Sequence, residues 1–203
     1  EDALTSVPES FTKQPEYDTV NVTGTENVFK IAQKLGIKVI FASSAAVYGD
    51  VQKIPIDENS ERRPLNPYGK TKMNAELLAE KYSKLGVDVM GLRYFNVYGP
   101  RQNNEYSGVI TKFLENIVND KSPVIYGDGL QTRDFIHVKD VAIANLLAMK
   151  SKTKYGFINI GTGIATTILD LARMVIHASG LSLGPVFVES LKGDIRQSQA
   201  DIT

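Results

Sequence analysis

Residues 66–95 read NPYGKTKMNAELLAEKYSKLGVDVMGLRYF, a helical pattern followed directly by an apolar run. Pro67 is suited to the first turn of a helix, because proline lacks the N–H that a first-turn residue leaves unpaired. Gly86 is placed to end the helix, and the branched and aromatic residues of 87–95 predict a strand. This stretch therefore predicts a helix leading into a strand, the repeating unit of a parallel α/β sheet.

The preceding segments repeat this alternation. Residues 39–44, VIFASS, predict another strand, and a helical pattern runs before it from about Tyr17 to Leu35, with Gly36 as the C-terminal cap. Strands alternating with helices of this length favour a parallel sheet covered on both faces. We therefore expect an α/β fold with a Rossmann-type doubly wound parallel sheet.

The pattern changes after Gly99, where a polar stretch begins. Turn residues at 127–129, GDG, predict a turn between two strands. The remaining segments predict a helix at 109–120, a helix at 138–150, a short strand at 157–161 and a Thr-capped helix at 166–180.

Composition excludes several classes of protein. The 203 residues contain 23 Lys and Arg against 23 Asp and Glu, so no net positive charge favours nucleic acid or an anionic membrane as partner. Cysteine is absent and the two histidines, His137 and His177, lie far apart, so we expect no disulfide and no metal site. No apolar run approaches a membrane span, and the opening EDALTSVPES lacks signal-peptide character, so we expect a cytoplasmic protein.

Tyr68 and Lys72 lie four positions apart in the predicted helix, and therefore on one face. An ammonium beside a phenol favours the phenolate, which can accept a proton. Taken alone, the pair could equally lie on a solvated helix face.

Polar residues follow both predicted strands, and ligands of doubly wound sheets bind outside the carboxyl ends of the strands. Residues 39–44 lead into Ser44 and the segment AAVYG, while 87–95 lead into Asn96. The helix of Tyr68 and Lys72 lies between these strands in the sequence. We expect these serine, tyrosine, lysine and asparagine side chains to converge on one crevice.

The chain resembles the extended short-chain dehydrogenase/reductase family, and within it the nucleotide-sugar epimerases of the UDP-galactose 4-epimerase type. The resemblance extends over nearly the whole chain, because the matching pieces keep the family order: SVPES, NVTGTENV, SSAAVYG, NPYGKTK, RYFNVYGPRQ, YGDGLQTRDFIHVKDV, NIGTG and GDIRQSQADI.

The resemblance implies catalytic roles for three residues. Tyr68 would be the base that takes the proton of a sugar 4-hydroxyl, and Lys72 would lower the pKa of Tyr68 and hydrogen-bond the nicotinamide ribose. Ser44 would bridge the sugar hydroxyl and Tyr68, although a strand-end serine can also bind backbone alone. NAD is the implied cofactor, with contacts from Asn21, Ser44, Tyr68, Lys72, Tyr94 and Phe95. Strand aromatics such as the last two can instead be core residues.

Substrate contacts are implied in the same way. Asn96 would bind the sugar or phosphate, and Arg133 the diphosphate, a task suited to a guanidinium fork. Tyr126 would pack on uracil, Asp194 would lie near the nucleotide ribose, and Ser198 would line the sugar wall. The alternatives are a turn-forming asparagine, a solvated arginine, and common turn residues at positions 126 and 194. His137 is expected to be structural.

The implied reaction is 4-epimerisation of a UDP-hexose through a 4-keto intermediate. Related dehydratases place an Asp-Glu pair after the catalytic Ser or Thr, and related decarboxylases place a glutamate there, whereas this chain has Ala45 and Ala46, which cannot move a proton. The small Ser198 leaves room for a 2-acetamido sugar, so UDP-Glc/UDP-Gal and UDP-GlcNAc/UDP-GalNAc are both candidate pairs. A non-catalytic nucleotide-sugar-binding remnant, a dehydratase and a reductase of the same fold remain alternatives.

The chain departs from the family pattern at several places. The glycine fingerprint G-x-x-G-x-x-G and the last helices of the family are not in these residues, and Leu191 stands where many relatives have an arginine. We expect a part of a longer, active epimerase. Residues 1–99 and 134–160 would form the dinucleotide-binding domain, and 100–133 and 161–203 a smaller nucleotide-sugar-binding domain. A homodimer through the helices at 17–35 and 66–85 is also expected.

Overall fold

A three-stranded parallel sheet forms the centre of the computed structural model, which describes residues 3–102, 108–191 and 194–203. Its strand order is β1 (Val39–Ser44), β2 (Val89–Tyr94) and β6 (Tyr155–Ile160). The register pairs Ser44 with Tyr94, and Tyr94 with Ile160. The three carboxyl ends are therefore level, which confirms the parallel α/β sheet expected from the sequence.

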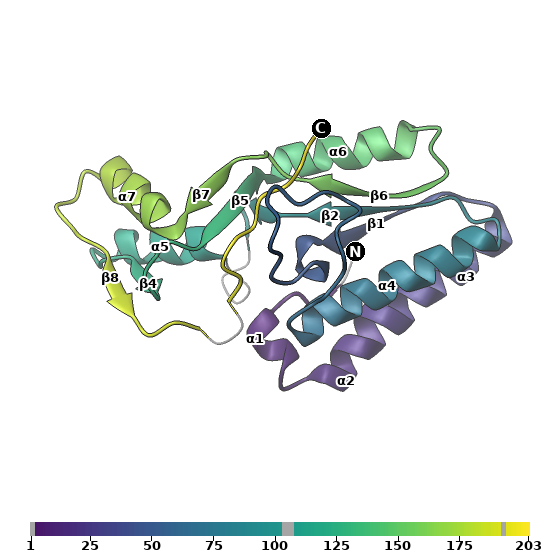
Figure 1. Cartoon of the computed structure of the whole chain (residues 1–203), viewed down its shortest axis with the longest axis horizontal. Coiled ribbons are helices and arrows are strands. Elements are labelled where there is room, and N and C mark those ends of the chain that lie inside the picture. Colours follow the sequence, from purple (N-terminus) through teal and green to yellow (C-terminus); the bar gives the residue numbers. More distant parts are fainter. Residues whose placement is uncertain (1–2, 103–107, 192–193) are drawn as a thin grey trace.

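Helices cover both faces of this sheet (Figure 1). Helices α3 (Gly24–Leu35) and α4 (Pro67–Lys84) lie side by side on one face, and α6 (Val138–Lys150) lies on the other. The helix-end signals predicted from the sequence lie at the helix ends. Pro67 occupies the first turn of α4, and the Asn66 side chain caps this helix by accepting from Gly69 N at 2.8 Å. Gly36 ends α3 in the left-handed conformation at φ 63°.

The chain enters α3 through shorter helical pieces, α1 (Val7–Ser10), α2 (Gln14–Tyr17) and the π-helical η1 (Asp18–Thr23). The predicted single helix from Tyr17 to Leu35 thus contains a π-helical turn at its start. Below the sheet, the core cluster on this face is aromatic: Phe29 packs edge-on against Phe41, with ring centroids 5.7 Å apart. This packing fixes α3 and α4 against β1.

The rest of the chain forms small sheets beside the central one (Figure 1). Strand β5 (Thr132–His137) pairs with β3 (Asn96–Tyr98) in parallel and with β7 (Ala165–Thr167) in antiparallel, while β4 (Val124–Tyr126) pairs with β8 (Val186–Val188). The other elements are the helices α5 (Val109–Val118) and α7 (Ile168–Ser179), and the 3-10 turn η2 (Ala45–Val47).

The turn at GDG exists, but its flanking strands are not partners. Strand β4 turns away to pair with β8, more than fifty positions later in the chain, and β5 instead joins β3 and β7. Helices α5 and α7 pack under these strands around Phe113 and Ile125. The pairing with β8 joins segments about sixty positions apart, whereas a turn signal is local.

Among the described residues, no helix combines the length and the apolar character needed to cross a bilayer.

Candidate active site

A cavity of about 750 Å³ opens at the carboxyl ends of the central strands. The N-terminal segment, Ile56 and Leu65 give this cavity an apolar lining. Most of the predicted site residues also lie on its wall, namely Ser44, Tyr68, Tyr94, Phe95, Asn96, Arg133, Asp194 and Ser198. The expected convergence on one crevice is therefore found for Ser44, Tyr68 and Asn96, whereas Lys72 lies beside the Tyr68 ring and is not among the lining residues. The level strand ends explain it, because each strand delivers its next residues to the same edge.

The Ser44 hydroxyl lies beside the Tyr68 phenol, and both line the cavity. Ser44 is the last residue of β1, and its Oγ also accepts from Ala46 N at 3.1 Å, so it caps the 3-10 turn as well. Both uses of the strand-end serine are thus present. The backbone contact holds the hydroxyl in place beside Tyr68.

Lys72 lies one turn after Tyr68 on α4, with its Nζ 5.8 Å from the centroid of the Tyr68 ring. The ammonium also donates to Ala42 O at 3.0 Å, and Lys72 is buried at 8% exposure. A buried ammonium bonded to a backbone carbonyl on β1 is held rigidly, unlike a solvated surface lysine. The solvated-face alternative for this pair is excluded.

Burial raises the pKa of Tyr68 above its ordinary value, and the hydrogen bond from Ser44 opposes that rise. The sequence suggested the opposite direction, from the nearby lysine. Desolvation of the phenolate is the larger effect here.

Asn21 does not line either described cavity. Its amide is buried in η1, where it accepts from Leu4 N and donates to Leu4 O, both at 2.9 Å. Nδ2 also donates to Thr71 Oγ1 at 3.1 Å, directly before Lys72. In this structure Asn21 joins the N-terminal segment to α4 on the Lys72 side of the site.

Tyr94 and Phe95 end β2 at the cavity wall, in different environments. The Tyr94 hydroxyl contacts the side-chain amide of Asn145 on α6: it accepts from Nδ2 at 2.7 Å and lies 3.0 Å from Oδ1. Phe95 is buried among Val47 and Ile56. Phe95 is therefore both a core residue and part of the wall, and Asn96 follows at the start of β3.

A second cavity of about 230 Å³ adjoins the first. The two share Asn96, Arg133, Leu191 and Asp194, and Tyr126 lines only the second. Two adjoining spaces with an arginine at their junction suit an elongated ligand whose anionic part lies in the middle.

Arg133 is mostly buried, and three backbone or carboxylate oxygens hold its guanidinium. Nη1 donates to Thr132 O and Ile195 O, both at 2.7 Å, and Nη2 makes a short contact with the Asp194 carboxylate. Burial lowers the pKa of Arg133, and the nearby Asp194 charge opposes this. Among the described residues these contacts use three of the five N–H donors.

The remaining predicted positions are also located. Ser198 is buried on the wall of the larger cavity, the half-buried Ala45 and Ala46 also line it, and Leu191 lines both cavities. His137 caps α6 by accepting from Lys139 N at 3.2 Å, which confirms a structural role.

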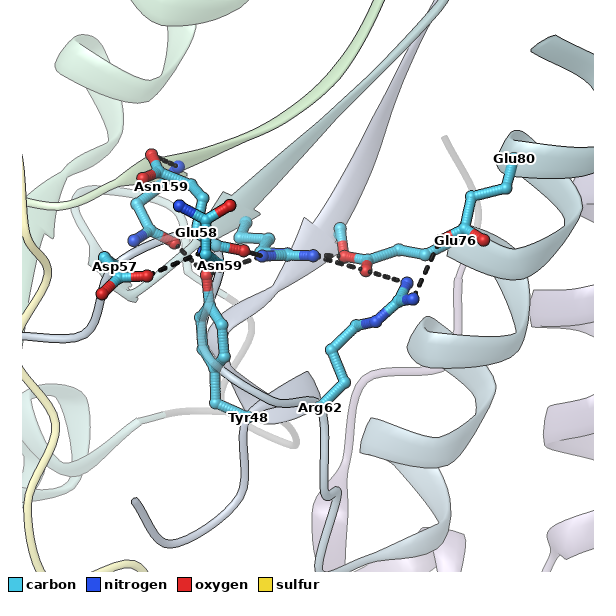
Figure 2. Close-up of polar contacts among 10 residues, drawn as sticks. Tyr48, Asp57, Glu58, Asn59, Arg62, Glu76, Glu80 and Asn159 are labelled. Carbon is cyan, nitrogen blue, oxygen red and sulfur yellow. Dashed lines mark hydrogen bonds and ion pairs between the residues drawn. The ribbon is translucent and has the colours of Figure 1, made fainter. Parts of the chain in front are cut away.

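A buried polar network behind the cavity was missed in the sequence (Figure 2). It joins Glu76 on α4 and Arg93 on β2 to Tyr48, Arg62 and Asn159. Nothing in the local pattern separates such charges from surface ones. The only signal was their positions, because Arg93 falls inside an apolar strand and Glu76 follows Tyr68 and Lys72 on the same helix face.

Residues 2–161 match the profile of the NAD dependent epimerase/dehydratase family. The chain belongs to this family. A member from Methanocaldococcus jannaschii, named provisionally as a UDP-glucose 4-epimerase, is 40% identical over 195 residues, which are 94% of this chain. The chain spans 63% of the length of that relative.

Solved structures of epimerases match over the whole chain. The UDP-N-acetylglucosamine 4-epimerase of Methanobrevibacter ruminantium, in complex with UDP-N-acetylmuramic acid, has a TM-score of 0.95 and 39% identity, covering 100% of this chain and 66% of that one. The UDP-glucuronic acid 4-epimerase of Bacillus cereus, in complex with UDP-glucuronic acid and NAD, has a TM-score of 0.89 and 33% identity, covering 98% and 64%. The family also includes dehydratases, such as the dTDP-D-glucose 4,6-dehydratase of Bos taurus, 36% identical over 177 residues, 86% of this chain and 49% of that protein.

Proposed function

We propose that this protein catalyses NAD-dependent 4-epimerisation of a UDP-hexose. The observation that supports it most is the placement of Ser44 and Tyr68 together in the cavity wall, with the buried Lys72 ammonium 5.8 Å from the centroid of the tyrosine ring. A non-catalytic binding module has no use for a phenol with a serine and a buried ammonium beside it.

The residues of this wall fit the nicotinamide end of NAD. Tyr94 and Phe95 offer aromatic surface and Tyr68 offers a hydroxyl, while Lys72 offers an ammonium beside the Tyr68 ring, behind this wall. Bound NAD supplies a hydride acceptor that gives the hydride back at the end of the cycle. These four residues and Ser44 would hold it, with Asn21 supporting the lysine side through Thr71.

Tyr68 would remove the proton of the sugar 4-hydroxyl, directly or through Ser44. Because burial raises the pKa of Tyr68, the phenol needs positive charge nearby to act as a base near neutral pH. Lys72 provides one such charge, held by Ala42 O. Ser44 bonds the same phenol and can pass a proton over a short path.

The two adjoining cavities support a nucleotide sugar as substrate. A diphosphate at Arg133 would meet the N–H donors left over from its protein contacts, with the hexose towards Tyr68 and the uridine towards Tyr126 and Asp194. The small Ser198 on the sugar side supports a 2-acetamido hexose as well as glucose and galactose. On this proposal the nucleotide-sugar-binding part comprises residues 100–133 and 161–203.

Epimerisation is favoured over dehydration by Ala45 and Ala46, which lie in the cavity wall after Ser44. Neither side chain can donate or accept the proton that elimination of water requires. Because relatives in the family include dehydratases, analysis of the product decides between epimerisation and dehydration.

The test is to incubate the purified protein with UDP-Gal and with UDP-GalNAc in D₂O and to analyse the products by chromatography and mass spectrometry. Epimerisation gives the C4 epimer with unchanged mass and no solvent deuterium, because the hydride stays within the site. A product lighter by one water would instead assign a dehydratase. Tyr68→Phe is the matched inactive variant, since it removes only the phenolic hydroxyl.

We further propose a homodimer through α3 and α4. Apolar side chains are exposed along both helices, including Ile31 at 55%, Leu35 at 66% and Leu77 at 47%. A second copy covering them would remove this apolar surface from water. Light scattering should give twice the chain mass, and Ile31→Glu should give the monomer; a monomeric wild type would refute the proposal.

A further inference from the structure

We propose that Glu76 is a positioning residue that sets the distance between Tyr68 on α4 and Ser44 on β1. It acts through the buried network of Figure 2, and touches neither of the two described cavities. The catalytic part of this inference rests on the proposed function, whereas its geometric part does not.

Glu76 is fully buried, and both carboxylate oxygens are satisfied. Oε1 accepts from Ser43 Oγ at 2.6 Å and from Arg93 Nε at 2.9 Å. Oε2 accepts from Arg93 Nη2 at 2.8 Å and from Arg62 Nη1 at 3.0 Å. Hydrogen bonds to an ionised group of this kind are short and directional.

The partners of Glu76 are the immediate neighbours of site residues. Ser43 precedes Ser44 on β1, and Arg93 precedes Tyr94 on β2. Glu76 itself lies two turns after Tyr68 on α4, on the same face. One carboxylate therefore joins the helix that holds the phenol to the two strand ends that hold its neighbours.

Apolar packing alone does not fix α4 along the strands. Its buried apolar residues near this point are the small Ala75 and Ala79, and hydrophobic contact is non-directional. A displacement of α4 along the sheet would cost little there, but it would break the short bonds of Glu76. The ion pair therefore adds a second directional contact to the bond from Lys72 Nζ to Ala42 O, and it alone ties α4 to both Ser43 and Arg93 among the described residues.

Arg93 is itself held from its other side, so that it offers Glu76 a fixed partner. Nη1 donates to Tyr48 OH at 2.8 Å and to Glu58 O at 2.9 Å, and Tyr48 OH donates to Asn159 Oδ1 at 2.7 Å. The guanidinium carbon lies 4.9 Å from the Tyr48 ring centroid and 5.0 Å from that of Phe157. Arg93 is 3% exposed, and rotation of its side chain is blocked by these contacts.

A purely stabilising role predicts a different outcome. Replacing both members of a buried ion pair with apolar side chains of similar volume is often neutral or stabilising, because two charges no longer need desolvation. Glu76→Met combined with Arg93→Met therefore removes the directional contact without leaving a buried charge. The single variant Glu76→Gln keeps the shape of the side chain and is the second test.

The first measurement is the crystal structure of each variant, made without substrate. We expect the distance between Ser44 Oγ and the Tyr68 hydroxyl to change in both variants, although the double variant melts close to the wild type. A wild-type distance in the folded double variant, or in Glu76→Gln, would overturn the proposal. This outcome is independent of turnover, so it separates failure of the positioning from failure of the proposed function.

The second measurement is kcat and KM as a function of pH with UDP-Gal. We expect kcat to fall about tenfold to a hundredfold in both variants, because a misplacement of about 1 Å can cost that much, with KM within about twofold. The acidic limb of the profile should move to higher pH, since loss of the Ser44 bond raises the pKa of Tyr68. Unchanged kcat and limb would refute the catalytic part.

Glu80→Gln is the matched control. Glu80 lies one turn beyond Glu76 on α4 and binds only Arg62 among the described residues, through Nη2 at 2.8 Å. It contacts neither β1 nor β2 in the network of Figure 2. The Glu80→Gln variant should keep the wild-type kcat, the wild-type acidic limb of the pH profile and the wild-type distance between Ser44 and Tyr68. If kcat fell as much in Glu80→Gln as in Glu76→Gln, the specific role of Glu76 would be contradicted.

Discussion

Arg133→Lys is expected to weaken the binding of UDP far more than the binding of uridine. The lysine retains the charge and loses the planar fork, so it cannot hold Ile195 O and also meet a diphosphate. In the structure two of the three described contacts of Arg133 are to backbone oxygens of Thr132 and Ile195, leaving two N–H donors among the described residues for a ligand.

The magnitude follows from the loss of one hydrogen bond to a charged oxygen. Such a bond contributes about 1.5–3 kcal/mol, which corresponds to about a 10- to 140-fold rise in Kd at room temperature. Calorimetric titration with UDP and with uridine measures the two values. Uridine lacks the diphosphate, so its Kd should rise by less than about threefold in Arg133→Lys.

Arg196→Lys is the control for this experiment. Arg196 makes a similar two-pronged pair with Asp128, at 2.7 and 2.9 Å, but both side chains are about half exposed and neither lines a described cavity. An exposed pair contributes little, so binding of UDP should be unchanged. If uridine and UDP weakened equally in Arg133→Lys, the arginine would act by holding the segment of Asp194, and its assignment to the diphosphate would be wrong.

Three further outcomes are expected. Tyr68→Phe should lower kcat about 10²- to 10⁴-fold with UDP-sugar affinity nearly unchanged, as checked by initial rates and calorimetry, since it removes the proton acceptor alone; weakened binding of similar size would contradict this. Burial raises the pKa of Tyr48 from 10.0 to about 12, so as the pH rises the Tyr48 hydroxyl loses its proton later in the folded state than in the unfolded state. The free energy of unfolding should therefore fall by about 2–3 kcal/mol between pH 10 and pH 12. Denaturant unfolding across that pH range should show this fall in the free energy of unfolding in the wild type and a smaller fall in Tyr48→Phe. Phe29→Ala should cost about 3–5 kcal/mol in urea unfolding because Phe29 is fully buried, whereas Val118→Ala on α5, where Val118 is 82% exposed, should change stability by less than about 0.5 kcal/mol; equal losses would refute the assigned core.

Much of the site was predictable because its signals are local. The helix from Pro67 and the strands at 39–44 and 89–94 follow from end signals and apolar runs. Their parallel order then brings Ser44 to the same edge as Asn96. The placement of Arg133 and Asp194 in the same wall came from resemblance rather than from periodicity.

Other features could not be predicted, because they depend on what surrounds a residue. Glu76 and Arg93 carry charges that in most positions are solvated, and only the packing of α4 on β1 and β2 buries them together. The direction of the Tyr68 pKa shift likewise required the burial of its ring, which sequence spacing does not show. The pairing of β4 with β8 joins strands about sixty positions apart, which no local pattern shows.

The sequence by itself determined the order of the longer helices and of the three central strands, the helical face shared by Tyr68 and Lys72, and the family to which the chain belongs, because these depend on neighbours a few positions apart or on motifs in order. Tertiary structure alone decided which charges are buried, which strands pair and how the phenol titrates. These properties depend on desolvation and on contacts between distant segments, and both exist only once the chain has folded.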